Sequence, residues 1–298
     1  MAQAHILLGA GTDVVAPVVR RIRPADLFDA LAHGWDDFAA MPTHALFLCA
    51  IYPLIGIVLA GLTMGFAVLP LLFPLAAGFA LIGPVAAIGL YELSRRREAG
   101  APVTAADALN ALHAPSTDAI AALGVLLLVL FVIWVAAARA IYIDNFGYAA
   151  PASVGAFIHD VLFTPAGWSL ILVGNGVGFL FAVVALSISV VSFPLLLDRD
   201  VGAAVALLTS VRVVLANPLA MALWGLIVAA LLLIGSLPLF VGLAVTLPVL
   251  GHATWHLYRK AVAPDSNPRP DYGPPAPEGR RYAADFPAVL WPWFREDR

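Results

Sequence analysis

Charged residues are scarce in this chain. Asp, Glu, Lys and Arg make up 12% of its 298 residues, while 62% are hydrophobic. A soluble domain carries about 25% charged residues. Because a water-soluble core cannot absorb this much apolar surface, the composition predicts a polytopic membrane protein. The net charge of −3 also argues against a nucleic acid as the partner.

Cysteine occurs once, as Cys49 within an apolar stretch. An intrachain disulfide is therefore impossible, and a metal or iron–sulfur centre held by several cysteines is excluded. The first residues lack the basic segment and compact apolar core of a cleaved signal peptide. The first membrane helix is therefore expected to direct insertion.

The residue patterns of common catalytic sites are also missing. The sequence contains no recognisable Ser–His–Asp arrangement, no phosphate-binding glycine loop and no pair of carboxylates within an apolar span. An enzymatic activity therefore has little support, and no cofactor is predicted.

Long apolar stretches are what the chain does have. A helix that crosses a bilayer needs about 20 mainly apolar residues. Six stretches qualify: 43–63, 67–92, 118–142, 167–191, 219–236 and 238–258. The predicted fold is therefore all-α, a polytopic bundle of six transmembrane helices. Prolines inside the second and sixth stretches are expected to kink them.

Two of these stretches resemble each other. Residues 74–96 align without a gap on residues 238–260, and the matching residues of the first stretch are Pro74, Leu75, Gly78, Ala80, Pro84, Val85, Leu93 and Arg95. Such internal similarity is typical of membrane proteins built from repeated helical units.

Three segments, 24–41, 104–114 and 202–216, precede the three predicted hairpins and have an amphipathic pattern. In the first, one helical face carries Leu27, Leu31, Trp35 and Phe38, and the other largely carries Asp26, Asp29, His33 and Asp37. We expect all three to be interfacial helices on the cytoplasmic side. The predicted organisation is a flexible N-terminus (1–23), a membrane domain of three interfacial-helix-plus-hairpin units (24–261) and a proline-rich cytoplasmic tail (262–298).

The basic residues give this topology an orientation. Fifteen of the 16 Lys and Arg residues fall on one side, and the loops of the other side contain none. The positive-inside rule makes the basic side cytoplasmic, so both termini are expected there. The remaining basic residue, Arg139, lies near the outer end of the third span. It would either pair with Asp144 or Asp160 or extend to the membrane surface.

His252 and His256 are the most suggestive polar residues. They lie four positions apart and share a helical face, so they could bind a metal ion together with a third ligand. The repeat places Glu92 at the position of His256. The alternative is that all three are anchors in the inner headgroup layer, beside Arg95 and Arg259, with anionic lipid headgroups as neighbours.

A second polar group follows the fourth span. Asp198 and Arg199 could form a structural clamp with Arg212 or with the cluster that begins at Arg95. The far end of the tail carries three large aromatic residues, Trp291, Trp293 and Phe294. They would either dock onto a partner or lie in the headgroup layer, as tryptophan commonly does.

Several short motifs occur in order along the chain: Gly34-Trp35, Gly83-Pro84, the run from Tyr91 to Gly100, the run from Ser189 to Arg199, and the run from Gly251 to His256. Together they resemble the bacterial integral-membrane family with domain of unknown function 2189, over roughly residues 25–262. The resemblance implies a multi-pass protein of the bacterial inner membrane and carries no established activity.

Some members of that family are labelled as cytochrome c oxidase subunit I. That role requires a full set of buried histidine ligands, and only His44, His252 and His256 lie within or at the edge of a predicted span. The first functional hypothesis is therefore a non-catalytic protein that assists or stabilises a larger membrane complex, such as a respiratory complex. The alternatives are a small transporter for a lipid-like or small solute, and a metal or haem binder that uses His252 and His256.

Overall fold

The computed structural model describes residues 17–41, 69–79, 83–114, 116–238 and 241–264. Over these residues the fold is helical, as predicted, and the β-structure among them is an isolated bridge between Val19 and Val262. The predicted first span, 43–63, and the aromatic tail residues Trp291, Trp293 and Phe294 lie outside the described residues.

Among the described residues, three helical stretches are long and apolar enough to cross a membrane. The first is α8 (Thr117–Phe146), and the second is α10 (Pro165–Ser189) continued by α11 (Ser192–Asp198). The third is α13 (Pro218–Ser236). They confirm the predicted third, fourth and fifth spans. At about 1.5 Å per residue, the 30 residues of α8 cover about 45 Å, enough for the hydrocarbon core and both headgroup layers.

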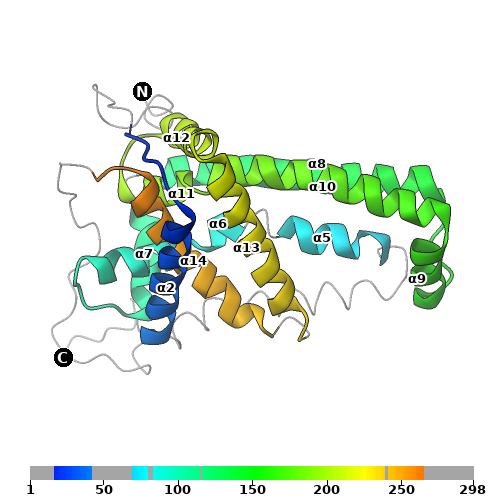
Figure 1. The fold of residues 1–298 in the computed structure, drawn as a ribbon, viewed down its shortest axis with the longest axis horizontal. Coiled ribbons are helices and arrows are strands. Elements are labelled where there is room, and N and C mark those ends of the chain that lie inside the picture. Colours follow the sequence, from blue (N-terminus) through cyan, green and yellow to red (C-terminus); the bar gives the residue numbers. More distant parts are fainter. Residues whose placement is uncertain (1–16, 42–68, 80–82, 115, 239–240, 265–298) are drawn as a thin grey trace, which may run out of the picture.

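Helices α8 and α10 run side by side along the long axis of the molecule (Figure 1). A Cβ added at Gly178 would lie 2.9 Å from the Trp134 ring, so this glycine allows the two helices to approach closely. Away from this contact, large apolar side chains such as Leu128, Leu172 and Phe179 are exposed. An apolar surface of this kind fits the hydrocarbon layer of a bilayer.

A short helix, α9 (Val154–Phe163), caps the far end of the α8–α10 pair (Figure 1). This stretch lies between the predicted spans 118–142 and 167–191, where the sequence predicts a loop. Polar caps define its ends: the Ser153 hydroxyl accepts the amide of Ala156, and the Thr164 hydroxyl accepts the amide of Gly167 at the start of α10.

The predicted second span, 67–92, is not one continuous helix. The chain forms η2 (Leu69–Leu71), α5 (Leu72–Phe79), α6 (Gly83–Ala86) and α7 (Ile88–Glu98). Pro84 therefore stands in the first turn of α6, where a missing amide hydrogen costs little. The predicted sixth span overlaps α14 (Leu243–Ala261), which contains Pro248. The polar second half of α14 keeps it outside the three candidate spans.

The amphipathic segments form α2 (Pro24–Ala40), the 3₁₀ helix η4 (Ala105–His113) and α12 (Ala203–Ala216). Thr104 and Asp107 form a capping box at the start of η4, with the Thr104 amide donating to Asp107. In α2, however, Asp37 is only 5% exposed and Trp35 is 53% exposed. The expectation that Asp37 faces water is wrong, because α2 packs lengthwise on α14.

Candidate functional site

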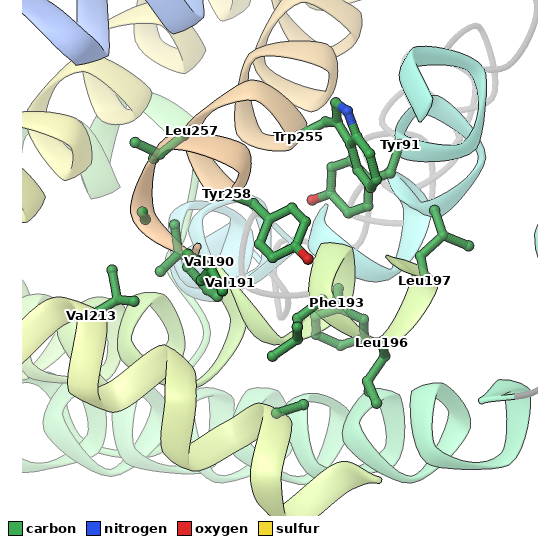
Figure 2. Close-up of a cluster of buried hydrophobic side chains, with 14 of the residues drawn as sticks. Tyr91, Val190, Val191, Phe193, Leu196, Leu197, Val213, Trp255, Leu257 and Tyr258 are labelled. Atoms are coloured by element: carbon green, nitrogen blue, oxygen red, sulfur yellow. The ribbon is translucent and has the colours of Figure 1, made fainter. Parts of the chain in front are cut away.

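The ends of α7, α11 and α14 meet in a buried apolar core. In Figure 2 the ring of Tyr258 lies between Trp255 and Phe193, and all three side chains are at most 1% exposed. Polar atoms at the edge of this core are paired: the Tyr258 hydroxyl donates to Asp198 (2.6 Å), and the Trp255 indole donates to Glu98 (2.9 Å). This core fixes the depth and rotation of α14, and with them the positions of its two histidines.

Helix α2 approaches the same helix from the other side. A Cβ added at Gly34 would lie within 2.7–2.8 Å of the Cβ, N and Cα atoms of Ala253. Only glycine therefore permits this distance between the two backbones. The close approach brings Asp37, one helical turn further along α2, onto the face of α14 that carries His252 and His256.

Five side chains then converge, and we call them the Asp37 network: Asp37, Ser94, Arg97, His252 and His256. One carboxylate oxygen of Asp37 lies 2.6 Å from Ser94 Oγ and 2.8 Å from His256 Nε2, and the other lies 2.6 Å from Arg97 Nη1. Ser94 Oγ also lies 2.8 Å from His252 Nδ1. The network joins α2, α7 and α14.

The hydrogen atoms of the network can be assigned by counting donors. Ser94 has one hydroxyl hydrogen and donates it to Asp37. His252 Nδ1 must therefore carry a hydrogen and donate to Ser94, while His256 Nε2 donates to Asp37. Burial raises the pKa of Asp37, but the hydrogen bonds from His256 and Ser94 outweigh it and leave the pKa below its ordinary value.

Glu92 is fully buried and belongs to a neighbouring cluster. Its carboxylate accepts two hydrogen bonds from Arg95, at 2.7 and 2.9 Å, and one from Arg96 at 2.8 Å. Arg96 also lies 3.6 Å from Asp107 in the first turn of η4. The internal repeat aligns Glu92 with His256, and the structure gives the two residues different ionic partners.

Asp198 and Arg199, the proposed clamp, connect α11 to the end of α14. Besides accepting from Tyr258, Asp198 lies 3.4 Å from Arg199 and 3.9 Å from Arg259. Arg199 also donates to the backbone carbonyl of Ala263 at 2.5 Å. Arg212 is exposed on α12, and Arg95 contacts Glu92.

With this geometry established, the chain can be compared with known proteins. Residues 71–198 match the family model described as "Predicted integral membrane protein (DUF2189)". The resemblance to this family is confirmed over those residues. No curated protein and no solved structure matches the chain.

The match to the DUF2189 family runs from α5 to α11. It includes the motifs at Gly83-Pro84 and Tyr91–Gly100 and nearly all of the run from Ser189 to Arg199. Helices α2 and α14 lie outside it. The Asp37 network is therefore assembled from one helix within the family match and two helices outside it.

A Ser, a His and an Asp are close together here, although no such arrangement was recognisable in the sequence. In a hydrolytic triad the histidine stands between the serine and the carboxylate. Here Ser94 stands between Asp37 and His252, and both Ser94 and His252 are 0% exposed. A substrate cannot reach this hydroxyl, so the arrangement binds helices together and does not present a nucleophile.

Metal binding was the other chemistry considered for the histidines. Among the described residues, no group of three or more His, Cys, Asp or Glu side chains has an arrangement that could hold a metal ion. His256 also uses Nε2 to bond Asp37.

Sequence reasoning missed two members of the network, Asp37 and Ser94. Asp37 lies 219 positions before His256 and Ser94 lies 158 before His252, so no local spacing links them. One signal was present: the motifs Gly34-Trp35 and Gly251–His256 contain Gly34 and Ala253, at which the backbones of α2 and α14 come too close to leave room for a Cβ on residue 34.

Proposed function

We propose that this chain is a non-catalytic integral membrane protein that supports a larger membrane assembly, with its polar end acting as a rigid platform. One observation carries the proposal: the serine, histidine and glutamate side chains that could act in catalysis are buried and form hydrogen bonds or ion pairs with other side chains of the protein. Ser94, His252 and Glu92 are each 0% exposed. The hydrogen bonds of Ser94 connect α7 to α2 and α14, and the bond from Tyr258 to Asp198 connects α14 to α11. A rigid polar end of this kind suits contact with another protein.

We further propose the predicted topology, with six spans, interfacial helices and both termini on the cytoplasmic side of a bacterial inner membrane. The clustering of basic residues supports it, since Arg97, Arg199, Arg259 and Lys260 all contact groups at the same end of the molecule. At the opposite end, α9 and the segments that flank it, residues 147–164, carry no Lys or Arg; Arg139 lies about two turns before the end of α8. Reporter fusions after residue 150 and after residue 275 should report opposite sides of the membrane. A cytoplasmic signal at 150 would overturn this topology.

The supporting role is tested by gentle purification of the full chain from its native membrane, followed by identification of co-purifying proteins. We expect one membrane protein in a fixed ratio to the chain. The experiment is repeated with Trp291, Trp293 and Phe294 changed to alanine, and with the tail residues Tyr272 and Tyr282 changed to alanine as the matched control. Loss of the partner in the first variant alone would identify the aromatic tail end as the docking element.

Two other outcomes of the purification would contradict the supporting role. If the chain purifies alone and moves a small solute into proteoliposomes, the supporting role is wrong and the transporter alternative gains its first support. One bound zinc, copper, iron or haem per chain would instead favour the binder alternative.

A further inference from the structure

An extended segment before α2 fastens several helices together. We call residues 17–22 the strap. Arg20 N donates to the carbonyl of Ala261 (2.8 Å) and Ala263 N donates to the carbonyl of Val18 (2.9 Å), at the end of α14. Further along, Asn217 accepts the amide of Ile22 (2.9 Å) and donates to the carbonyl of Arg20 (3.1 Å).

These bonds decide which side chains of the strap face outward. Pro17 and Ile22 are buried, while Val18, Arg20 and Arg21 are exposed. Because the Asn217 side chain both accepts from and donates to the strap, the backbone that carries Arg20 and Arg21 is held beside the junction of α12 and α13. Pro218, the first residue of the candidate span α13, follows that junction directly.

The basic residues of this end divide into two groups. Arg95, Arg96, Arg97, Arg199, Arg259 and Lys260 each contact a carboxylate. By contrast, Arg20, Arg21 and Arg212 have no ion pair within the described part of the chain. Arg23 has a single contact, 4.0 Å from Asp26, and its side chain is 85% exposed. The neutralised group includes Arg95, Arg259 and Lys260, where sequence reasoning expected lipid headgroups.

Arg212 is surrounded by exposed apolar side chains. On the outer face of α12 it lies between Leu208, which is 51% exposed, and Leu215, which is 74% exposed; Leu219, at the start of α13, is 86% exposed. In Figure 1, α12 runs across the α8–α10 pair and not along it. An exposed row of leucines with one arginine, on a helix that crosses the spans, fits the boundary between acyl chains and headgroups.

We propose that Arg20, Arg21 and Arg212 form a binding site for the phosphate-bearing headgroups of anionic lipids, at the point where α13 enters the membrane. Leu215 and Leu219 contact the acyl chains of the same lipids, and the strap holds two of the three arginines in place. The positive charge of the arginines complements the negative charge of the lipid phosphates, and the site adjoins the candidate span α13. The inference needs only the membrane location of the chain, so it stands or falls separately from the supporting role.

The test uses the full chain purified in a zwitterionic detergent and titrated with phosphatidylglycerol or phosphatidylcholine, with bound lipid counted by native mass spectrometry. Each arginine near an anionic surface contributes about a fivefold gain in binding. Changing Arg20, Arg21 and Arg212 to glutamine should therefore weaken phosphatidylglycerol binding at least tenfold and leave phosphatidylcholine binding unchanged. The preference of the parent protein for phosphatidylglycerol over phosphatidylcholine should also weaken as the salt concentration rises.

Arg139→Gln is the matched control, because Arg139 is exposed on α8 away from the strap. It should keep the full preference for phosphatidylglycerol. If the triple variant aggregates, the single variants Arg20→Gln and Arg212→Gln are compared with Arg139→Gln, each expected to lose about fivefold.

Two results would overturn the proposal. The first is a triple variant, or both single variants, with the same phosphatidylglycerol preference as the parent. The second is complete displacement of bound phosphatidylglycerol by millimolar glycerol phosphate. That result would show that the preferred occupant is a free phosphate compound and not a membrane lipid.

Discussion

The contact between α2 and α14 gives the sharpest prediction, which is the effect of Gly34→Ala. In an open helix this change stabilises by about 1 kcal/mol, because alanine is the better helix former. At Gly34 the new methyl group would lie 2.7 Å from the Cβ and N atoms of Ala253 and 2.8 Å from its Cα. Two of these three atoms belong to the backbone and cannot rotate away.

Overpacking of this kind costs about 1–3 kcal/mol, and the rigid neighbours favour the upper end. After the gain in helix propensity is subtracted, we expect a net loss of about 2 kcal/mol. At roughly 2–4 °C per kcal/mol for chains of comparable size, the melting temperature in detergent should fall by about 4–8 °C. The measurement is thermal unfolding followed by size exclusion of the surviving folded protein.

Gly174→Ala on α10 is the control, because a Cβ there meets no atom within 4 Å. It should leave the melting temperature unchanged or raise it slightly. Adding Ala253→Gly to Gly34→Ala should recover only part of the loss, since the N and Cα atoms of residue 253 remain. Equal melting temperatures for Gly34→Ala and Gly174→Ala would refute the close approach of α2 and α14.

Four further predictions concern the polar contacts and the tail. Asp37→Asn should destabilise the fold by about 2–3 kcal/mol, because Ser94 and His256 lose a charged acceptor and the partly exposed Arg97 loses its ion pair, whereas the exposed neighbour Asp36→Asn should have little effect in the same thermal assay. Since folding lowers the pKa of Asp37, the ionised carboxylate stabilises the fold above about pH 4, and this stabilisation is lost as the pH falls through the folded-state pKa. The melting temperature of the parent should therefore fall more steeply in acid than that of Asp37→Asn, and equal slopes would contradict this. Tyr258→Phe should cost about 1–3 kcal/mol by leaving Asp198 short of a buried donor, and a melting temperature equal to the parent's would mean that this bond adds no stability. Removal of residues 265–298 should leave the melting temperature within a few degrees of the parent's, and degradation of the shortened chain would show that the tail is structural.

Much of the fold could be predicted because composition alone decides it. The stretches at α8, α10 and α13 are apolar over a membrane thickness, and no soluble packing can hide them. The cap before η4 was predictable for a similar reason, since Thr104 and Asp107 interact within one helical turn. Local chemistry was sufficient in each case.

The candidate site was only partly predictable. The spacing of His252 and His256 predicted a shared face, and both do approach one carboxylate. That the carboxylate is Asp37 could not be foreseen, because an aspartate on the polar face of an amphipathic helix ordinarily faces water. A pairing across 219 positions depends on how α2 and α14 pack, and packing of this kind leaves no trace in local periodicity.

The separation of Asp37 from its histidines also has a consequence for biosynthesis. His256 is added to the chain 219 residues after Asp37. At about 5–20 residues per second, the ribosome therefore spends roughly 10–45 s making chain in which α2 has no α14 to pack on. During that interval a carboxylate and the bare backbone at Gly34 face the surroundings, and the strap has neither Asn217 nor Ala261 to bind. The first helix of the described fold is thus among the last to be secured, and a translation product that stops before α14 exposes a polar face by which quality control could recognise it as unfinished.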